Sequence, residues 1–238
     1  MRTLTKSLAL ASLAALALSG LYAQQAPAAT KSFAGDGFLY VSPEKAQAAG
    51  VDAYSSATQA MDENEKGKLP PDKVKARILE FLKGSGDYRE MYVLATCYQD
   101  RPVASAIELV LDPATMRFYA TSERQTEKLF QIFANPEVSA VHVRQLSPEE
   151  IAAGKNYFSI SEGVQLFGKA RLLKGGDSGF DEALKFYMPT LTKKPLDKAT
   201  LERMRKSTIV IEIEPESLVL VDGALLRSGM NYKQIWKP

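Results

Sequence analysis

The sequence has very few of the residues that usually build disulfides and metal sites. Among 238 residues there is one cysteine, Cys97, and one histidine, His142. A single cysteine excludes an internal disulfide, and its setting in LATCY indicates a small, buried hydrophobic side chain. A lone histidine without cysteines or carboxylates at ligand spacing argues against a zinc site. We therefore predict no metal site.

Several catalytic motifs are missing as well. The sequence contains no Gly-x-Ser-x-Gly elbow, no metalloprotease motif and no Cys-His-Asn set. The glycines at 175, 176 and 179 lack the lysine and the following hydroxyl residue of a phosphate-binding P-loop. These absences argue against hydrolase chemistry and favour a plain loop around the glycines.

Neither sign of charge is in clear excess. The chain has 30 basic and 28 acidic residues, and loss of residues 1–23, which include Arg2 and Lys6, would leave 28 of each. A neutral protein is a poor match for a polyanion, so we expect no nucleic-acid partner.

The one long apolar run lies at the N-terminus. A short basic start, MRTLTKS, is followed by LALASLAALALSGLYA and then by several alanines. This pattern predicts a signal peptide over residues 1–23 that is cleaved on export, so we expect a periplasmic or secreted protein. The run is shorter than the about 20 apolar residues of a comfortable membrane span, and we expect no stable membrane insertion after cleavage.

The remaining sequence divides into an extension and one domain. Residues 24–70 mix short apolar pieces with a charged run and two prolines, which predicts an N-terminal extension or linker. The domain is expected over residues 71–238. It starts with a helix over 71–83, in which Val74 and Ile78 lie on one face.

Seven β-rich stretches follow this helix. They cover residues 91–98, 103–112, 116–122, 138–143, 158–173, 208–214 and 217–223, and further helices begin near Phe180 and Asp197. Many short strands with few helices predict a small closed barrel. The expected fold class is mainly β with α, with six to seven antiparallel strands and flanking helices.

A polar turn after the strand FYAT is the first candidate site. Ser122 with Gln125 three residues later fits a capping box, which places the expected helix start near Glu123. Backbone N–H groups at a helix start have no intrahelical partner and lie at the positive end of the helix dipole, so they can bind a phosphate. Arg124 and Lys128 would add charged donors. The alternative is an ordinary capped helix that binds nothing.

The order of these elements resembles that of split-barrel flavoproteins related to pyridoxamine 5′-phosphate oxidase. The resemblance runs from about Asp72 to Trp236. It rests on the helix 71–83, MYVLATCY, the turn QDRP, VASAIELVLD, RFYAT with its polar turn, the helix ending in Asn135-Pro136, VSAVHV and GVQLFGKARLL. It implies a split β-barrel that forms a homodimer and binds FMN at the subunit interface. The protein would then be an exported FMN-dependent oxidoreductase.

The resemblance also implies which residues bind the cofactor. The FMN phosphate would be surrounded by Thr121, Arg124, Thr126 and Lys128, the ribityl chain or ring edge would lie along Ser105 and Ala106, and Gln165 would contact the ring from the other subunit. Two positions depart from the oxidase, which has arginines where this chain has Ser105 and Glu127. Fewer cations should weaken phosphate binding. The end of the chain, MNYKQIWKP, also lacks the arginine-rich signature that binds pyridoxamine phosphate, so another substrate is expected.

Alternatives remain open at this point. Some split-barrel relatives bind haem instead of flavin, which would make His142 a candidate iron ligand. The same barrel could also hold flavin or haem without turnover, or keep an empty site for protein interactions. Tyr119, Tyr157 and Glu108 are equally placed candidates for a proton donor, so no catalytic residue is assigned.

Overall fold

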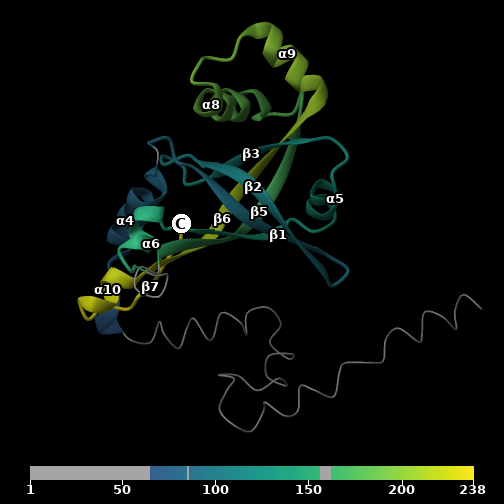
Figure 1. Cartoon of the computed structure of the whole chain (residues 1–238). Coiled ribbons are helices and arrows are strands. Elements are labelled where there is room, and N and C mark those ends of the chain that lie inside the picture. The colour runs from purple at the N-terminus through teal and green to yellow at the C-terminus, as the bar shows by residue number, and fades with distance from the viewer. Residues whose placement is uncertain (1–64, 85, 156–161) are drawn as a thin grey trace, which may run out of the picture. The chain divides into compact units, whose positions relative to one another are not determined.

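Seven strands form one antiparallel sheet in the computed structural model, which describes residues 65–84, 86–155 and 162–238 (Figure 1). The strand order is β3-β2-β1-β4-β5-β6-β7, and an additional pairing of β3 with β6 closes the first six strands into a barrel. The bounds are β1 Arg89–Tyr98, β2 Arg101–Leu111, β3 Phe118–Glu123, β4 Glu137–Val143, β5 Glu162–Lys174, β6 Thr208–Asp222 and β7 Lys233–Trp236. The predicted antiparallel barrel is confirmed. The signal peptide and most of the extension, residues 1–64, lie outside the described residues.

Helices flank the barrel on several sides. Their bounds are η2 Glu65–Gly67, α4 Pro71–Lys83, α5 Glu127–Ala134, α6 Pro148–Ala152, α8 Phe180–Thr192, α9 Lys198–Ser207 and α10 Gly223–Arg227. Figure 1 shows α4 and α5 on opposite sides of the barrel and α8 with α9 above it. The predicted helix over 71–83 and the helix starts near Phe180 and Asp197 are confirmed. In the described part of the chain, no helix combines the length and the apolar character needed to cross a membrane.

Two of these helices seal the barrel interior. On α4, Val74, Ile78 and Leu82 are buried at the spacing of one helical face, as the sequence predicts. On α5, Leu129 and Ile132 are buried in the same cluster, which also contains the inward-facing side chains of the strands. The main core is therefore the barrel lumen with one helix packed at either side.

The strand β6 corrects one sequence expectation. The stretches 208–214 and 217–223 were expected as two strands because Pro215 between them interrupts the pattern, but they form one continuous strand. The register with β5 shifts between Phe167 and Gly168, so Pro215 lies at a β-bulge, where a missing N–H is tolerated. Gly168 is required there, because a Cβ would lie 2.3 Å from the carbonyl oxygen of Glu214.

The C-terminal strand β7 was not expected. It pairs with the second half of β6, along the same edge that β3 uses in the first half. Trp236 at its end is buried in the main core. The side-chain amide of Gln234 accepts from the N–H of Leu69 at 2.8 Å and donates to the carbonyl oxygen of Gly67 at 3.0 Å. These bonds fasten the residues before α4 to the end of the chain.

The barrel opens between β2 and β3. The two strands pair only through Val110 with Tyr119 and Leu111 with Phe118. Beyond this point β3 runs along β6, whereas residues 101–109 of β2 pair only with β1 in the described chain. We call this divergence the β2–β3 split. It leaves one edge of β2 with unpaired backbone groups that are open to a ligand or a partner.

Replacing Ile78 with alanine tests whether α4 seals the core. Ile78 has an exposed fraction of 0%, so its truncation should lower the free energy of unfolding by about 2–5 kcal/mol through lost burial and a residual cavity. Urea unfolding followed by circular dichroism measures the change. Lys73→Ala, at an exposed position of the same helix, is the control and should stay within about 0.5 kcal/mol. Similar stability of the two variants would contradict a sealing role for α4.

Candidate functional site

The polar turn lies between β3 and α5, and its helix begins later than predicted. Strand β3 continues to Glu123, and α5 begins at Glu127 with Thr126 as N-cap. The predicted capping box of Ser122 and Gln125, with a helix start near Glu123, is therefore wrong. Ser122 is held in the sheet by pairing with β6, and Gln125 has a φ of 66°, in the left-handed region.

The start of α5 has free hydrogen-bonding capacity. Thr126 forms no side-chain cap, although its hydroxyl lies 3.1 Å from that of Ser122. The N–H groups of Leu129 and Phe130 donate to the carbonyl oxygen of Thr126 at 3.1 and 3.4 Å. The N–H groups before them lie in the first turn, where helix geometry provides no intrahelical acceptor. This end of α5 is therefore suited to an anion.

The acidic side chain at the helix start is directed along the helix. The carboxylate of Glu127 accepts from the side-chain amide of Gln131, one turn later, at 3.4 Å. Gln131 is only 4% exposed and its amide oxygen accepts from the hydroxyl of Thr96 on β1. This buried amide ties both Glu127 and α5 to the barrel. Repulsion between Glu127 and a phosphate at the turn is thereby reduced.

The cations of the turn form no ion pair within the described part of the chain. Arg124 is exposed and Lys128 is half-buried, and neither forms an ion pair with another described residue. Charge-assisted hydrogen bonds to phosphate are about twice as strong as neutral ones. With the hydroxyl of Thr126 and the first-turn N–H groups, this donor set fits a phosphate.

The opposite side of the β2–β3 split carries Ser105 and Ala106. Ser105 pairs with the buried Leu94 of β1, whereas Ala106 pairs with Val93 and is exposed on the outer surface. If the register of β2 and β3 is continued past their last pair, Ser105 comes level with Arg124 across the split. The predicted residues Ser105 and Arg124 thus lie on the two sides of the split. Thr121 on β3 faces away from the core.

Gln165 lies apart from the other predicted residues. The register places Ala106, Val93, Val141 and Gln165 in one row across β2, β1, β4 and β5. Three strand spacings separate Ala106 from Gln165, which amounts to about 14 Å along the sheet. Within one chain, Gln165 therefore does not join the site at the split.

The surface around this row is apolar. The outward side chains of Met91, Val93, Val141, Val143 and Phe167 are all exposed, with Met91 at 55%. We call these five residues the outer apolar face. Contiguous exposed apolar side chains on neighbouring strands are typical of binding surfaces.

His142, the candidate haem ligand, is enclosed by protein groups. Its Nδ1 lies 2.9 Å from the carbonyl oxygen of Met91 and its Nε2 lies 3.9 Å from the carboxylate of Glu90. The rings of Phe81 and Tyr92 are each 5.4 Å from the imidazole, centroid to centroid. Among the described residues, no three side chains of the metal-binding types gather into a site. The surroundings of His142 thus favour a packing role.

The candidate proton donors are also placed by the structure. Burial, with the carboxylate of Glu212 nearby, raises the pKa of Tyr119, so its phenol stays protonated and is a weaker acid than usual. Tyr157 lies outside the described residues. Glu108 on β2 belongs to a polar group with Arg89 and Tyr187 that the sequence did not reveal, because its members are as far apart as 98 residues.

A separate pocket of about 250 Å³ lies away from the split. It is formed by α4, β5, β6 and α10, and its lining includes the ion pair of Arg77 with Asp222, at 2.7 Å, and the side chains of Phe81 and Glu162. No residue of the predicted site lines it. The chemistry of the turn therefore does not depend on this pocket.

Comparison with known proteins bears on the fold. No family model and no curated protein matches the sequence. A conserved hypothetical protein of Mycobacterium tuberculosis has a similar structure, with a TM-score of 0.50 and 16% identity over 64% of this chain and 86% of the other. A candidate pyridoxamine 5′-phosphate oxidase of Listeria innocua is 20% identical over 62% of this chain and 98% of the other, with a TM-score of 0.43.

The haem storage protein of Vibrio cholerae is also similar, with 16% identity over 63% of this chain, 96% of the other and a TM-score of 0.46. The closed six-strand pairing and the divergence of β2 from β3 decide the architecture. The chain has the split-barrel fold. Similarity at this level of identity concerns the fold alone.

Replacing Thr96 with valine tests the buried amide under the turn. The variant removes the hydroxyl that donates to Gln131 and leaves a buried amide oxygen without its donor, which should cost about 1–3 kcal/mol of stability. Thr96→Ser keeps the hydroxyl and is the control. Equilibrium unfolding in urea should show the valine variant of the split barrel to be the less stable of the two. Equal stability would mean that Gln131 does not depend on Thr96.

Proposed function

We propose that this split barrel is an exported FMN-binding protein and acts as an FMN-dependent oxidoreductase on a small-molecule substrate. The observation that carries the proposal is the pair of surfaces at the β2–β3 split. One side has an uncapped helix start with two cations that pair with no acidic side chain among the described residues, and the other side has an exposed strand edge. A flavin phosphate fits the first side, and a flat ring system fits the second.

The residues of the chain would bind and orient the cofactor. Thr126 and Lys128, with the first-turn N–H groups of α5, would hold the phosphate, and Arg124 would approach it from the turn. Ser105 and Ala106 would lie along the ribityl chain or ring edge. Bound FMN would supply hydride or electron transfer. Tyr119 is a poor general acid because of its raised pKa, so a proton would come from another group.

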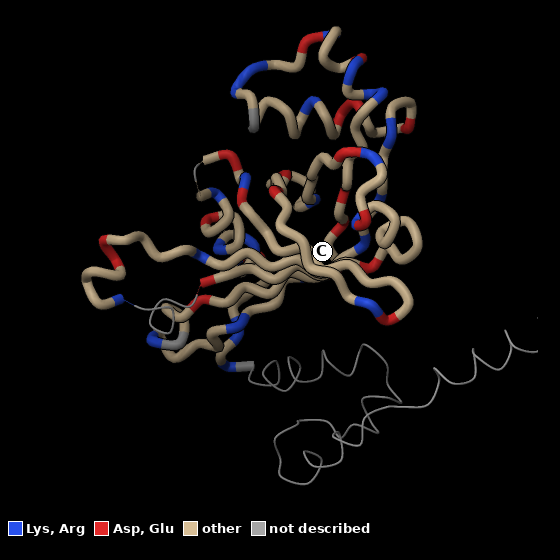
Figure 2. Tube along the Cα trace, turned by 45° about the vertical axis from the view of Figure 1, so that its right-hand side comes forward, with Lys and Arg blue, Asp and Glu red and all other residues tan. Residues whose placement is uncertain are grey.

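Export sets a condition on this cofactor. The leader over residues 1–23 supports transport of an unfolded chain, and FMN would then be taken up outside the cytoplasm. Positions 105 and 127, with serine and glutamate, give the site fewer cations than the oxidase has, which favours reversible binding. Cations and acids are interspersed along the described trace, and the central strands are mostly uncharged, which argues against a nucleic-acid partner (Figure 2).

A homodimer is part of the proposal. Val141, Val143 and Phe167 of the outer apolar face are exposed, and a second copy of the chain would remove them from water. Gln165 lies about 14 Å from Ala106 of its own chain, so its contact with the flavin ring would be made to the site of the other subunit.

Haem is the alternative cofactor, and a binding protein without turnover is the alternative function. Haem is less well supported, because both nitrogens of His142 lie close to protein oxygens and its ring faces aromatic side chains. A binding protein without turnover is supported by Ser105 and Glu127, which stand where the oxidase has two arginines. A visible spectrum distinguishes haem from FMN, and an assay of flavin reduction distinguishes an oxidoreductase from a binding protein without turnover.

FMN binding to the purified mature protein is the first test. Lys128→Ala should weaken FMN binding about tenfold or more, because a charge-assisted hydrogen bond to the phosphate is lost. Flavin fluorescence titration measures the dissociation constant. Lys198→Ala, which removes an exposed lysine of α9, is the control and should bind as the wild type does. A wild-type protein that does not retain FMN would refute the cofactor, and a Soret band with added haem would favour the alternative.

Sedimentation velocity tests the homodimer. The wild type should sediment as a dimer, and Val141→Glu should sediment as a monomer, because it places a charge in the middle of the outer apolar face. Ile151→Glu makes the same change at an exposed apolar residue of α6 outside this face and should remain a dimer. A monomeric wild type, or a dimeric Val141→Glu variant, would contradict this interface.

A further inference from the structure

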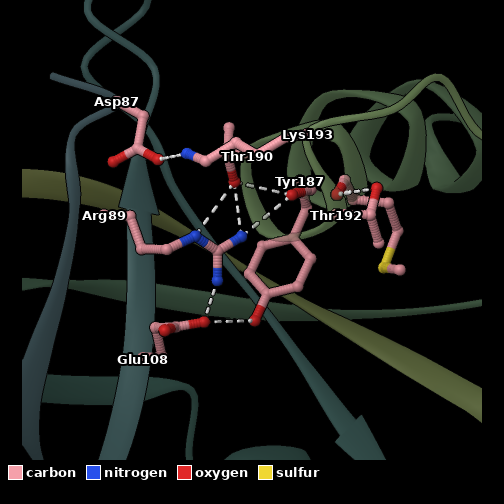
Figure 3. Close-up of polar contacts among 8 residues, drawn as sticks. Asp87, Arg89, Glu108, Tyr187, Thr190, Thr192 and Lys193 are labelled. Atoms are coloured by element: carbon pink, nitrogen blue, oxygen red, sulfur yellow. Dashed lines mark hydrogen bonds and ion pairs between the residues drawn. The ribbon is translucent and has the colours of Figure 1, made fainter. Parts of the chain in front are cut away.

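A polar group joins α8 to the outer surface of β1 and β2. Figure 3 shows the guanidinium of Arg89 between the helix and the strands, with Glu108 on one side and the C-terminal part of α8 on the other. Its Nε lies 3.2 Å from the hydroxyl of Thr190, and its Nη2 donates to the carbonyl oxygen of Tyr187 at 3.0 Å. Its Nη1 forms an ion pair with Glu108.

The contacts of Arg89 indicate a structural role for this residue. Its side chain is only 10% exposed, and its donors are directed to a helix C-terminus, where a cation is stabilised by the dipole. The guanidinium also lies 4.7 Å from the centroid of the Tyr187 ring. Next to it, Lys193 pairs with Asp87 (Figure 3). These contacts fasten the end of α8 to the barrel and use most of the N–H donors of Arg89.

Glu108 is only partly used by this group. Its Oε1 accepts from Arg89 and from the phenol of Tyr187, the latter at 3.3 Å. Its Oε2 makes no hydrogen bond or ion pair within the described part of the chain, and its side chain is 33% exposed. Glu108 is therefore a carboxylate fixed by one oxygen, with the other oxygen available.

The position of Glu108 connects it to the candidate site. It points to the same side of β2 as Ala106, two residues before it, and it pairs with Met91 on β1. Met91 and Val93 of the outer apolar face lie beside it. The carboxylate thus stands at the margin of an exposed apolar surface, next to the strand edge of the β2–β3 split.

We propose that Glu108 binds the ammonium or N–H group of a ligand whose apolar body lies on Ala106, Met91 and Val93. An ionised carboxylate accepts hydrogen bonds and offers no donor, so it selects a ligand that donates. The apolar residues around it select a hydrophobic body. The ligand class is therefore a small aromatic or aliphatic amine.

This inference deepens the proposed function. That the ligand is the substrate rests on the proposed function. The amine would lie at the β1–β2 side of the outer surface. The β4 and β5 side, with Val141, Val143 and Phe167, would remain for the second subunit. The substrate of the proposed oxidoreductase would then be an amine held beside the flavin ring edge at Ala106.

A pair of probes with the same body and opposite charge tests the inference. Phenethylamine and phenylacetate are titrated into the full mature protein, with and without FMN, and binding is followed by saturation-transfer NMR. Phenethylamine should bind and phenylacetate should bind at least about tenfold more weakly. Glu108→Gln keeps an amide oxygen for Arg89 and Tyr187 but should abolish this preference. Glu182→Gln, which removes an exposed carboxylate from α8, is the control and should retain it.

The outcomes separate this inference from the proposed function. Charge preference that is lost in Glu108→Gln supports it, even if FMN does not bind. Equal binding of the two probes to the wild type, or an unchanged preference in Glu108→Gln, overturns it, whatever the affinity for FMN. A purely structural role of Glu108 would lower the melting temperature of the variant and leave the preference between amine and carboxylate unchanged.

Discussion

The pairing of β3 with β6 is the constraint on which the rest of the molecule depends. Because β3 follows β6 along its whole length, it meets β2 at only two positions and then leaves it. The chain must therefore cross from the end of β3 to the other side of the barrel, and α5 makes this crossing. Its buried residues Leu129 and Ile132 fill the lumen, and Gln131 bonds to Thr96. The pairing of β3 with β6 thus closes the barrel, and it also produces the split and fixes the position of the polar turn.

The sequence predicts those features that depend on neighbouring residues. Helix α4 follows from the spacing of Val74, Ile78 and Leu82, and the polar turn with its cations is contained in one short segment. The capping box at Ser122 is wrong because a local pattern was outweighed by pairing with β6, more than 80 residues away. The predicted break of the strand at Pro215 is wrong because a β-bulge accommodates the proline. Gly168 lies opposite this bulge.

Features that join distant segments could not be read from the sequence. Strand β7 is short and needs the free half of the β6 edge to form at all. The group of Arg89, Glu108 and Tyr187 combines two strands with a helix that follows much later in the chain. Glu108 was recognisable as a polar residue in a β-rich stretch, but its fixed orientation depends on how α8 packs. The small second core under α8, with Phe180 and Leu184, has the same origin.

The separation of Ala106 from Gln165 has a genetic consequence. If each site takes its split from one subunit and its glutamine from the other, a chain that lacks Gln165 and a chain that lacks Lys128 are each inactive alone. In a mixed dimer the two defects fall into one site, and the second site is intact. Co-expression of the two chains would therefore restore half of the sites in each mixed dimer. Such complementation would arise because the sheet holds Ala106, beside the split, three strands away from Gln165.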